Sequence, residues 1–142
     1  MGYFENQIAY YEGRKTSNNN KIKKLEELYD SISAFKSEVE TSAGEFNAID
    51  ILKDDVLTDI ETIENCQSAT RYVAGMRQQK DGIANAYVKA FFIALEGAID
   101  LKKAQYWVEI EALEADNGFC NLKIAEYQAL IEAEKELEKV VP

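Results

Sequence analysis

Three observations predict that this chain of 142 residues is all-α, an elongated antiparallel helical hairpin with a short N-terminal helix. Apolar residues recur in steps of three and four over two long stretches, which is the period of a helix face. Only 7 glycines and 1 proline interrupt the sequence, so turns should be few. The length suits a single domain, 1–142, that can bury a sizeable core without disulfides or metals.

The first long helix is predicted over residues 20–65. Its apolar stripe drifts slowly around the helix, as a repeat near 3.5 does when two helices supercoil. Three successive asparagines, Asn18 to Asn20, offer N-cap chemistry just before it. Ahead of them, residues 1–17 have the pattern of a separate short helix that Gly13 ends.

Residues 66–82 are predicted to form the turn of the hairpin, because glycines and polar residues cluster there. Helical periodicity then resumes and runs over residues 83–140. The tripeptide Asp116-Asn117-Gly118 interrupts this second stretch. The second helix is therefore either continuous or kinked or broken near residue 117.

Composition excludes several classes of function. The chain has 26 acidic and 16 basic residues, a formal net charge of −10 and no histidine. It can therefore hold no Ser-His-Asp or Cys-His nucleophile and no His-ligated zinc, and its charge does not suit nucleic acid. The two cysteines, Cys66 and Cys120, would lie roughly 45–50 Å apart on such a hairpin, too far for a disulfide. We expect no enzyme activity, no cofactor, no metal and no nucleic-acid partner.

From the sequence we expect no export signal of the usual kind. Residues 1–11 lack a basic segment followed by an apolar run, so they are not predicted to form a secretory signal peptide. No stretch approaches the roughly 18 apolar residues of a membrane span. We expect a cytoplasmic protein without membrane insertion.

The second helix carries more apolar surface than one neighbour can cover. Its two apolar rows together span roughly 240° of the helix circumference. A helix that packs on one neighbour needs an apolar stripe little more than about 100° wide. We expect a stripe of small residues to pack closely on the first helix: Ala90, Ala94, Gly97, Ala98, Ala104 and Ala112. A row of large residues is then predicted to bind a partner: Phe92, Leu95, Ile99, Tyr106, Ile110 and Leu113. The N-terminal helix or a folded-back C-terminal segment could instead cover this row and complete a bundle within the chain.

Charge is segregated along the predicted hairpin. Residues 25–65 hold 12 acids and 2 bases, whereas residues 66–89 hold four bases and one acid. The local excess of +3 at the tip is either solvated surface or a recognition patch. The predicted recognition residues at the tip are Arg71, Tyr72, Gly75 and Arg77.

The layout of the whole chain resembles a known family. It opens with Met1-Gly2-Tyr3 and then Tyr10-Tyr11, followed by a charged helix, a short turn with an aromatic residue and a glycine, and a second long helix. This layout is similar to that of the YwqH-like small helical proteins, which are encoded beside LXG-domain toxins of type VII secretion in Gram-positive bacteria. It is also similar in plan to the helical hairpins named for a Trp-x-Gly turn, although Tyr72 stands one residue too far from Gly75 for that motif.

The resemblance implies a non-enzymatic accessory protein that binds the helical N-terminal domain of a cognate toxin. A second small helical protein is implied as a further partner. The protein would help present the toxin for export, either staying in the cytoplasm or leaving with its partner by type VII secretion. Export partners carry signals with an aromatic residue four positions before an acid; the candidates here are Phe46 with Asp50, and Trp107 with Glu111.

A second interpretation requires no toxin. Two copies of the hairpin would pair as a homodimer and form a four-helix bundle. The protein would then be a structural homo-oligomer whose apolar surface is covered by its own second copy.

Overall fold

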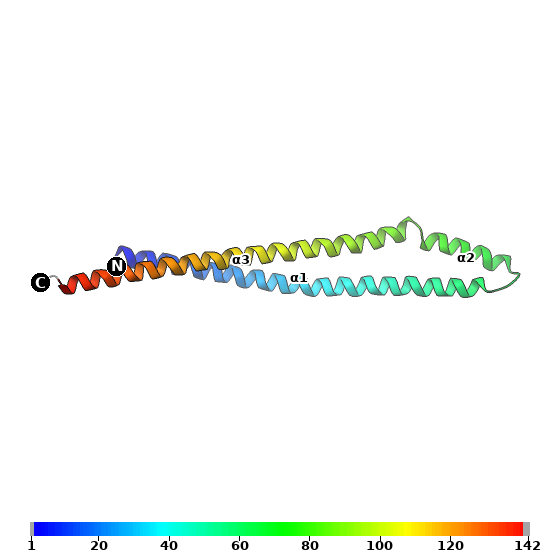
Figure 1. Cartoon of the computed structure of the whole chain (residues 1–142). Coiled ribbons are helices and arrows are strands. Elements are labelled where there is room, and N and C mark those ends of the chain that lie inside the picture. The colour runs from blue at the N-terminus through cyan, green and yellow to red at the C-terminus, as the bar shows by residue number, and fades with distance from the viewer. Residues whose placement is uncertain (1, 141–142) are drawn as a thin grey trace. The chain divides into compact units, whose positions relative to one another are not determined.

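The structure, a computed structural model, describes residues 2–140, which form three helices and no strand. They are α1 (Tyr3–Glu61), α2 (Gln67–Lys80) and α3 (Ile83–Val140). The predicted all-α helical hairpin is confirmed. The chain divides into two compact units, one formed by α1 up to Ser31 with α3 from Lys103, the other by residues 32–102 (Figure 1). In each unit the segment of α1 lies beside its own stretch of α3, and in the unit 32–102 it also lies beside α2.

The predicted separate helix over residues 1–17 is wrong, because α1 continues without a break through Gly13 and the three asparagines. Asn18 does not cap a helix: its amide nitrogen donates to Asp116 Oδ2 at 2.7 Å and to Asn117 Oδ1 at 3.1 Å. The Arg14 guanidinium also pairs with the Asp116 carboxylate. These polar side chains bond across to α3, so they do not compete with their own backbone and the helix runs on.

Helix α3 is continuous through Asp116-Asn117-Gly118, so the alternative of a kink or break there does not occur. Asp116 and Asn117 face α1 and take part in the bonds just described, and Gly118 lies on the exposed side. A turn-forming tripeptide is thus helical because two of its three side chains are satisfied by the facing helix.

The predicted turn over 66–82 contains a helix of 14 residues, α2, and this corrects the sequence prediction. Two short breaks flank it. The first contains Asn65, which has a left-handed φ of 57°, and the second is Asp81-Gly82. Gly75 lies inside α2 and has no positive φ.

The buried side chains lie where the helices of each unit face one another. In the unit 32–102 they are Val39, Leu57, Val73 and Ile99, and in the other unit they are Asn18, Ile110, Cys120 and Ile124. Both cysteines are free.

The continuity of α3 can be tested with two glycine substitutions. A Cβ added at Gly118 meets nothing within 4 Å, so Gly118→Ala should raise the free energy of unfolding by about 0.5–1 kcal/mol through helix propensity. A Cβ at Gly82 would lie 3.0 Å from the Gln78 carbonyl oxygen, so Gly82→Ala should lower it. Urea titration followed by circular dichroism measures both. A loss of stability in Gly118→Ala would contradict a continuous helix.

Candidate interaction surface

The row of large residues predicted to bind a partner lies in the seam between α1 and α3. In the unit 32–102, Ile99 is only 3% exposed, and Phe92 and Leu95 are half-buried. The Phe92 ring centre lies 6.2 Å from that of Phe46 on α1. This part of the row is therefore covered by the chain's own first helix.

The same holds in the other unit, where Ile110 is 3% exposed and Tyr106 and Leu113 are half-buried. The predicted division of the two faces is therefore wrong, because the large residues form the seam and the small ones face outward. In water a helix pair gains most by burying the largest apolar area, about 25 cal/mol per Å². Close approach over small residues matters more in lipid, where that gain is absent.

The outward face of α3 in the unit 32–102 is apolar over five turns. Ile83, Tyr87, Phe91 and Leu101 are each more than half exposed on it. Residues three and four apart share a helix face, so the exposed small residues lie between these large ones: Ala90, Ala94, Gly97 and Ala98. We call this surface the outer face of α3.

One window of 18 residues within Gln67–Val140 has a mean hydropathy of 1.3, with at most two charged residues. By length and composition alone this window could cross a membrane, in contrast to the prediction that no stretch is apolar enough. Only 6% of the window is buried, so burial in a core does not explain why these residues are apolar. The absence of membrane insertion stays a prediction.

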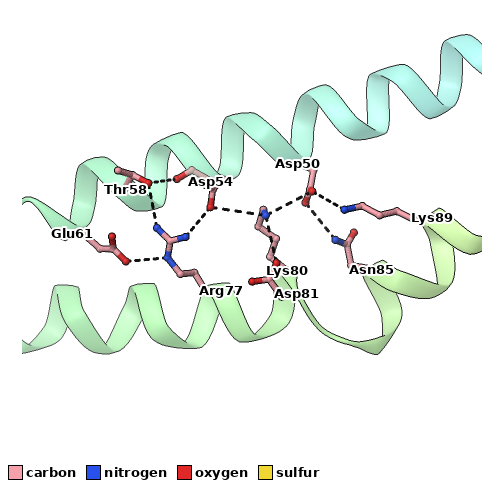
Figure 2. A network of polar contacts seen from close by, with 9 residues as sticks. All are labelled: Asp50, Asp54, Thr58, Glu61, Arg77, Lys80, Asp81, Asn85 and Lys89. Atoms are coloured by element: carbon pink, nitrogen blue, oxygen red, sulfur yellow. Dashed lines mark hydrogen bonds and ion pairs between the residues drawn. The ribbon is translucent and has the colours of Figure 1, made fainter.

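The basic residues of the tip hold α2 and α3 against α1. Figure 2 shows Arg77 reaching across to α1, where its Nη1 lies 2.8 Å from Asp54 Oδ1 and its Nε lies 3.0 Å from Glu61 Oε1. Its Nη2 also donates to Thr58 Oγ1 at 3.2 Å. The carboxylate of Glu61 is the main reason that the pKa of Arg77 is raised.

A second group of contacts centres on Asp50, which is largely buried. Its Oδ2 lies 3.2 Å from Lys89 Nζ and 3.7 Å from Lys80 Nζ, and Asn85 donates to its Oδ1 at 3.4 Å (Figure 2). The hydrogen bond from Lys89, with the charge of Lys80, lowers the pKa of Asp50 below its ordinary value. We call the contacts of Asp50, Asp54 and Glu61 with Arg77, Lys80 and Lys89 the polar clasp.

The four predicted tip residues all lie on α2. Arg77 belongs to the polar clasp, so the excess of basic residues in 66–89 is largely matched by acids of α1. Arg71, Tyr72 and Gly75 are exposed. A recognition role for these three stays a prediction.

The candidate export signals fall in different environments. Phe46 is half-buried in the seam and Asp50 belongs to the polar clasp, so both already have partners within the chain. Trp107 is 53% exposed, although its ring centre lies 6.2 Å from that of Tyr29, and Glu111 is exposed. Their role in export stays a prediction.

A groove beside the seam was not predicted from the sequence. Ile49, Leu52 and Val56 belong to the drifting apolar stripe of the first helix, yet each is more than half exposed. With residues of α2 and α3 they line a groove of about 630 Å³. The drift of the apolar stripe around α1 could have indicated this exposure. A stripe that drifts around a helix turns away from the facing helix unless the two helices supercoil. Within residues 2–140 no three acidic or cysteine residues are placed to hold a metal ion.

No family model, curated protein or solved structure matches the chain. Its function is therefore inferred from its own surface together with the layout of its sequence.

Two aspartate substitutions on α3 separate the seam from the outer face. Ile99→Asp places a carboxylate in a buried apolar seam and should lower the free energy of unfolding by about 3 kcal/mol or more. Leu101→Asp, two residues away and 62% exposed, should change it by less than about 0.5 kcal/mol. Chemical denaturation followed by circular dichroism gives both values. Equal effects would contradict the placement of the seam.

Acidification tests the polar clasp. Because the pKa of Asp50 is lower in the folded chain than in the unfolded chain, its ionised form stabilises the fold above the unfolded value of about 3.9. This stability is lost as the pH falls from about 4 through the folded pKa. Asp50→Asn should therefore lower the Tm at pH 7 and shrink the loss of Tm between pH 7 and pH 3. Asp55→Asn, at an exposed position, is the control and should keep the wild-type profile; an unchanged profile in Asp50→Asn would count against the clasp.

Proposed function

We propose that this protein is a non-enzymatic accessory protein that binds the helical N-terminal region of an LXG-type toxin for type VII secretion. The outer face of α3 is the proposed docking surface. This assignment replaces the row of large residues, which the seam already covers.

One observation carries the proposal: a continuous apolar helix face stays exposed although the seam of the same helix is full. Residues 83–101 span about 27 Å at 1.5 Å per residue, long enough for five turns of a partner helix. Exposed apolar surface of this extent on a chain with 30% charged residues is typical of an interaction site.

The arrangement of side chains on this face suits a helix. Small residues at Ala90, Ala94 and Ala98 repeat every four positions, so a partner backbone can approach closely there. Tyr87 and Phe91 stand beside them and can fill holes on the partner. The resemblance to the YwqH-like proteins supplies the class of partner, a helical toxin region.

The same small residues also support the alternative of a homodimer. Two copies could pack their outer faces together about a two-fold axis, because such an interface is self-complementary. The protein would then be a structural homo-oligomer without a toxin partner.

Co-purification tests both proposals. The chain is co-expressed with the helical N-terminal region of an LXG toxin, and the mixture is analysed by size exclusion with light scattering. We expect a complex that Leu101→Asp abolishes and Ile51→Asp retains. Leu101 and Ile51 are exposed to 62% and 63%, so the control is matched in exposure and chemistry. A homodimer that shows no affinity for the toxin would support the alternative and overturn the toxin proposal.

A further inference from the structure

We propose that the groove at the junction of the three helices in the unit 32–102 binds an amphipathic helix of the partner, with lysine or arginine along the edge of that helix that faces α1. The inference rests on the proposed function for the class of partner. It adds a second docking site and the charge pattern that this site selects.

The lining of the groove is apolar and regularly spaced. Ile49 and Val56 are seven residues apart on α1, which places them one above the other at about 10 Å along the helix. Tyr72 and Met76 line it from α2, and Val88 lines it from α3. A groove of about 630 Å³ with this spacing can receive apolar side chains at positions i, i+3 or i+4, and i+7 of a helix.

The charged groups at the inner edge of the groove are already satisfied. Asp50 and Lys80 line it, and each is bonded within the polar clasp. Lys53 also lines it, but it is exposed and its ammonium can stay in water. Apart from Lys53, the charged residues of the lining are thus already paired, which favours an apolar occupant over a small ionic ligand.

The outer rim of the groove on α1 is acidic. Asp55 and Asp59 follow Leu52 and Val56 by three residues, so they lie beside these lining residues on the side away from the seam. Both are exposed, and within residues 2–140 neither carboxylate forms an ion pair. A partner helix that inserts its apolar face here brings its flank next to these two carboxylates. Basic residues on that flank complement them, and the net charge of −10 favours the approach of such a helix.

A helix fits the groove better than an extended segment does. All three walls are helices, whose backbone groups are bonded internally, so within the described residues no strand edge is open for an added strand. The partner must therefore be recognised through side chains.

Two synthetic amphipathic peptides serve as probes. They share one leucine face and differ only in their flanking residues, lysine in one and glutamate in the other. Fluorescence anisotropy with the full chain should show the lysine peptide binding about three- to tenfold more tightly. Val56→Asp should weaken its binding about tenfold or more, and Tyr72→Ala is a second groove variant should Val56→Asp unfold. Ile51→Asp, whose side chain is exposed but does not line the groove, is the control and should bind as wild type.

Charge reversal tests the rim separately. Asp55→Lys with Asp59→Lys should reverse the preference, so that the glutamate peptide binds more tightly. Glu26→Lys with Asp30→Lys changes the net charge equally in the other unit and should keep the preference for lysine. Equal binding of the two peptides by the wild type, or an unchanged preference after reversal, would overturn the inference.

Two further arms distinguish this inference from the proposed function. If the toxin region binds and Val56→Asp has no effect on that complex, the groove is not a docking site although the proposed function stands. If the lysine peptide binds as described but the toxin region does not bind, the groove stands and the partner class is wrong.

Vesicles of phosphatidylcholine test a lipid as the occupant of the groove. Vesicle binding that Val56→Asp abolishes, in the absence of peptide binding, would assign the groove to lipid and overturn the inference.

Discussion

The seam of large apolar side chains between α1 and α3 is the constraint on which the rest of the structure depends. Ile99 and Ile110 are almost fully buried in it, each within its own unit. A pair of helices has only one seam, so an apolar residue outside that seam stays exposed unless a further helix, as α2 does in the unit 32–102, or another chain covers it. The outer face of α3 and the groove beside α2 are therefore consequences of how the seam is filled.

Polar contacts across the helix pair set which residues face one another. In one unit the Arg14 guanidinium and the Asn18 amide meet the Asp116 carboxylate, whose pKa is lowered chiefly by the bond from Arg14. In the other unit the polar clasp performs this role, and Lys36 Nζ lies 2.6 Å from Asp100 Oδ1. A shift of one helix by a turn would separate these partners and leave Asn18 buried without bonds. The segregation of acids in α1 and bases in residues 66–89 therefore fixes the alignment of the helices.

The fold class followed from the sequence because the periodicity of apolar residues is long and regular. The predictions were wrong where a polar side chain could form its hydrogen bonds either with its own backbone or with the opposite helix. Asn18 and Asp116 have the chemistry of caps and turns, but each finds a partner on the opposite helix, and no local rule reveals a partner about 98 residues away. The choice between the two faces of α3 failed for a related reason. Both rows have helical spacing, and only the match with Phe46 and the other large residues of α1 decides which row is buried.

The acidic charge of this chain opposes the aggregation that its exposed apolar surface would otherwise favour. Within each unit large apolar side chains stay more than half exposed, among them Ile51 and Leu101 in the unit 32–102 and Leu122 in the other. A net charge of −10 repels other copies and so opposes aggregation while such surface stays open. The acids are not spread evenly. Asp55 and Asp59 lie on α1 beside the lining of the groove, whereas the outer face of α3 is free of charge from Ala90 to Ala94 and again at Gly97 and Ala98. Repulsion between copies with acidic rims favours a partner of different charge over self-association, and for this reason we place the heterologous helix ahead of the homodimer as occupant of the exposed surface.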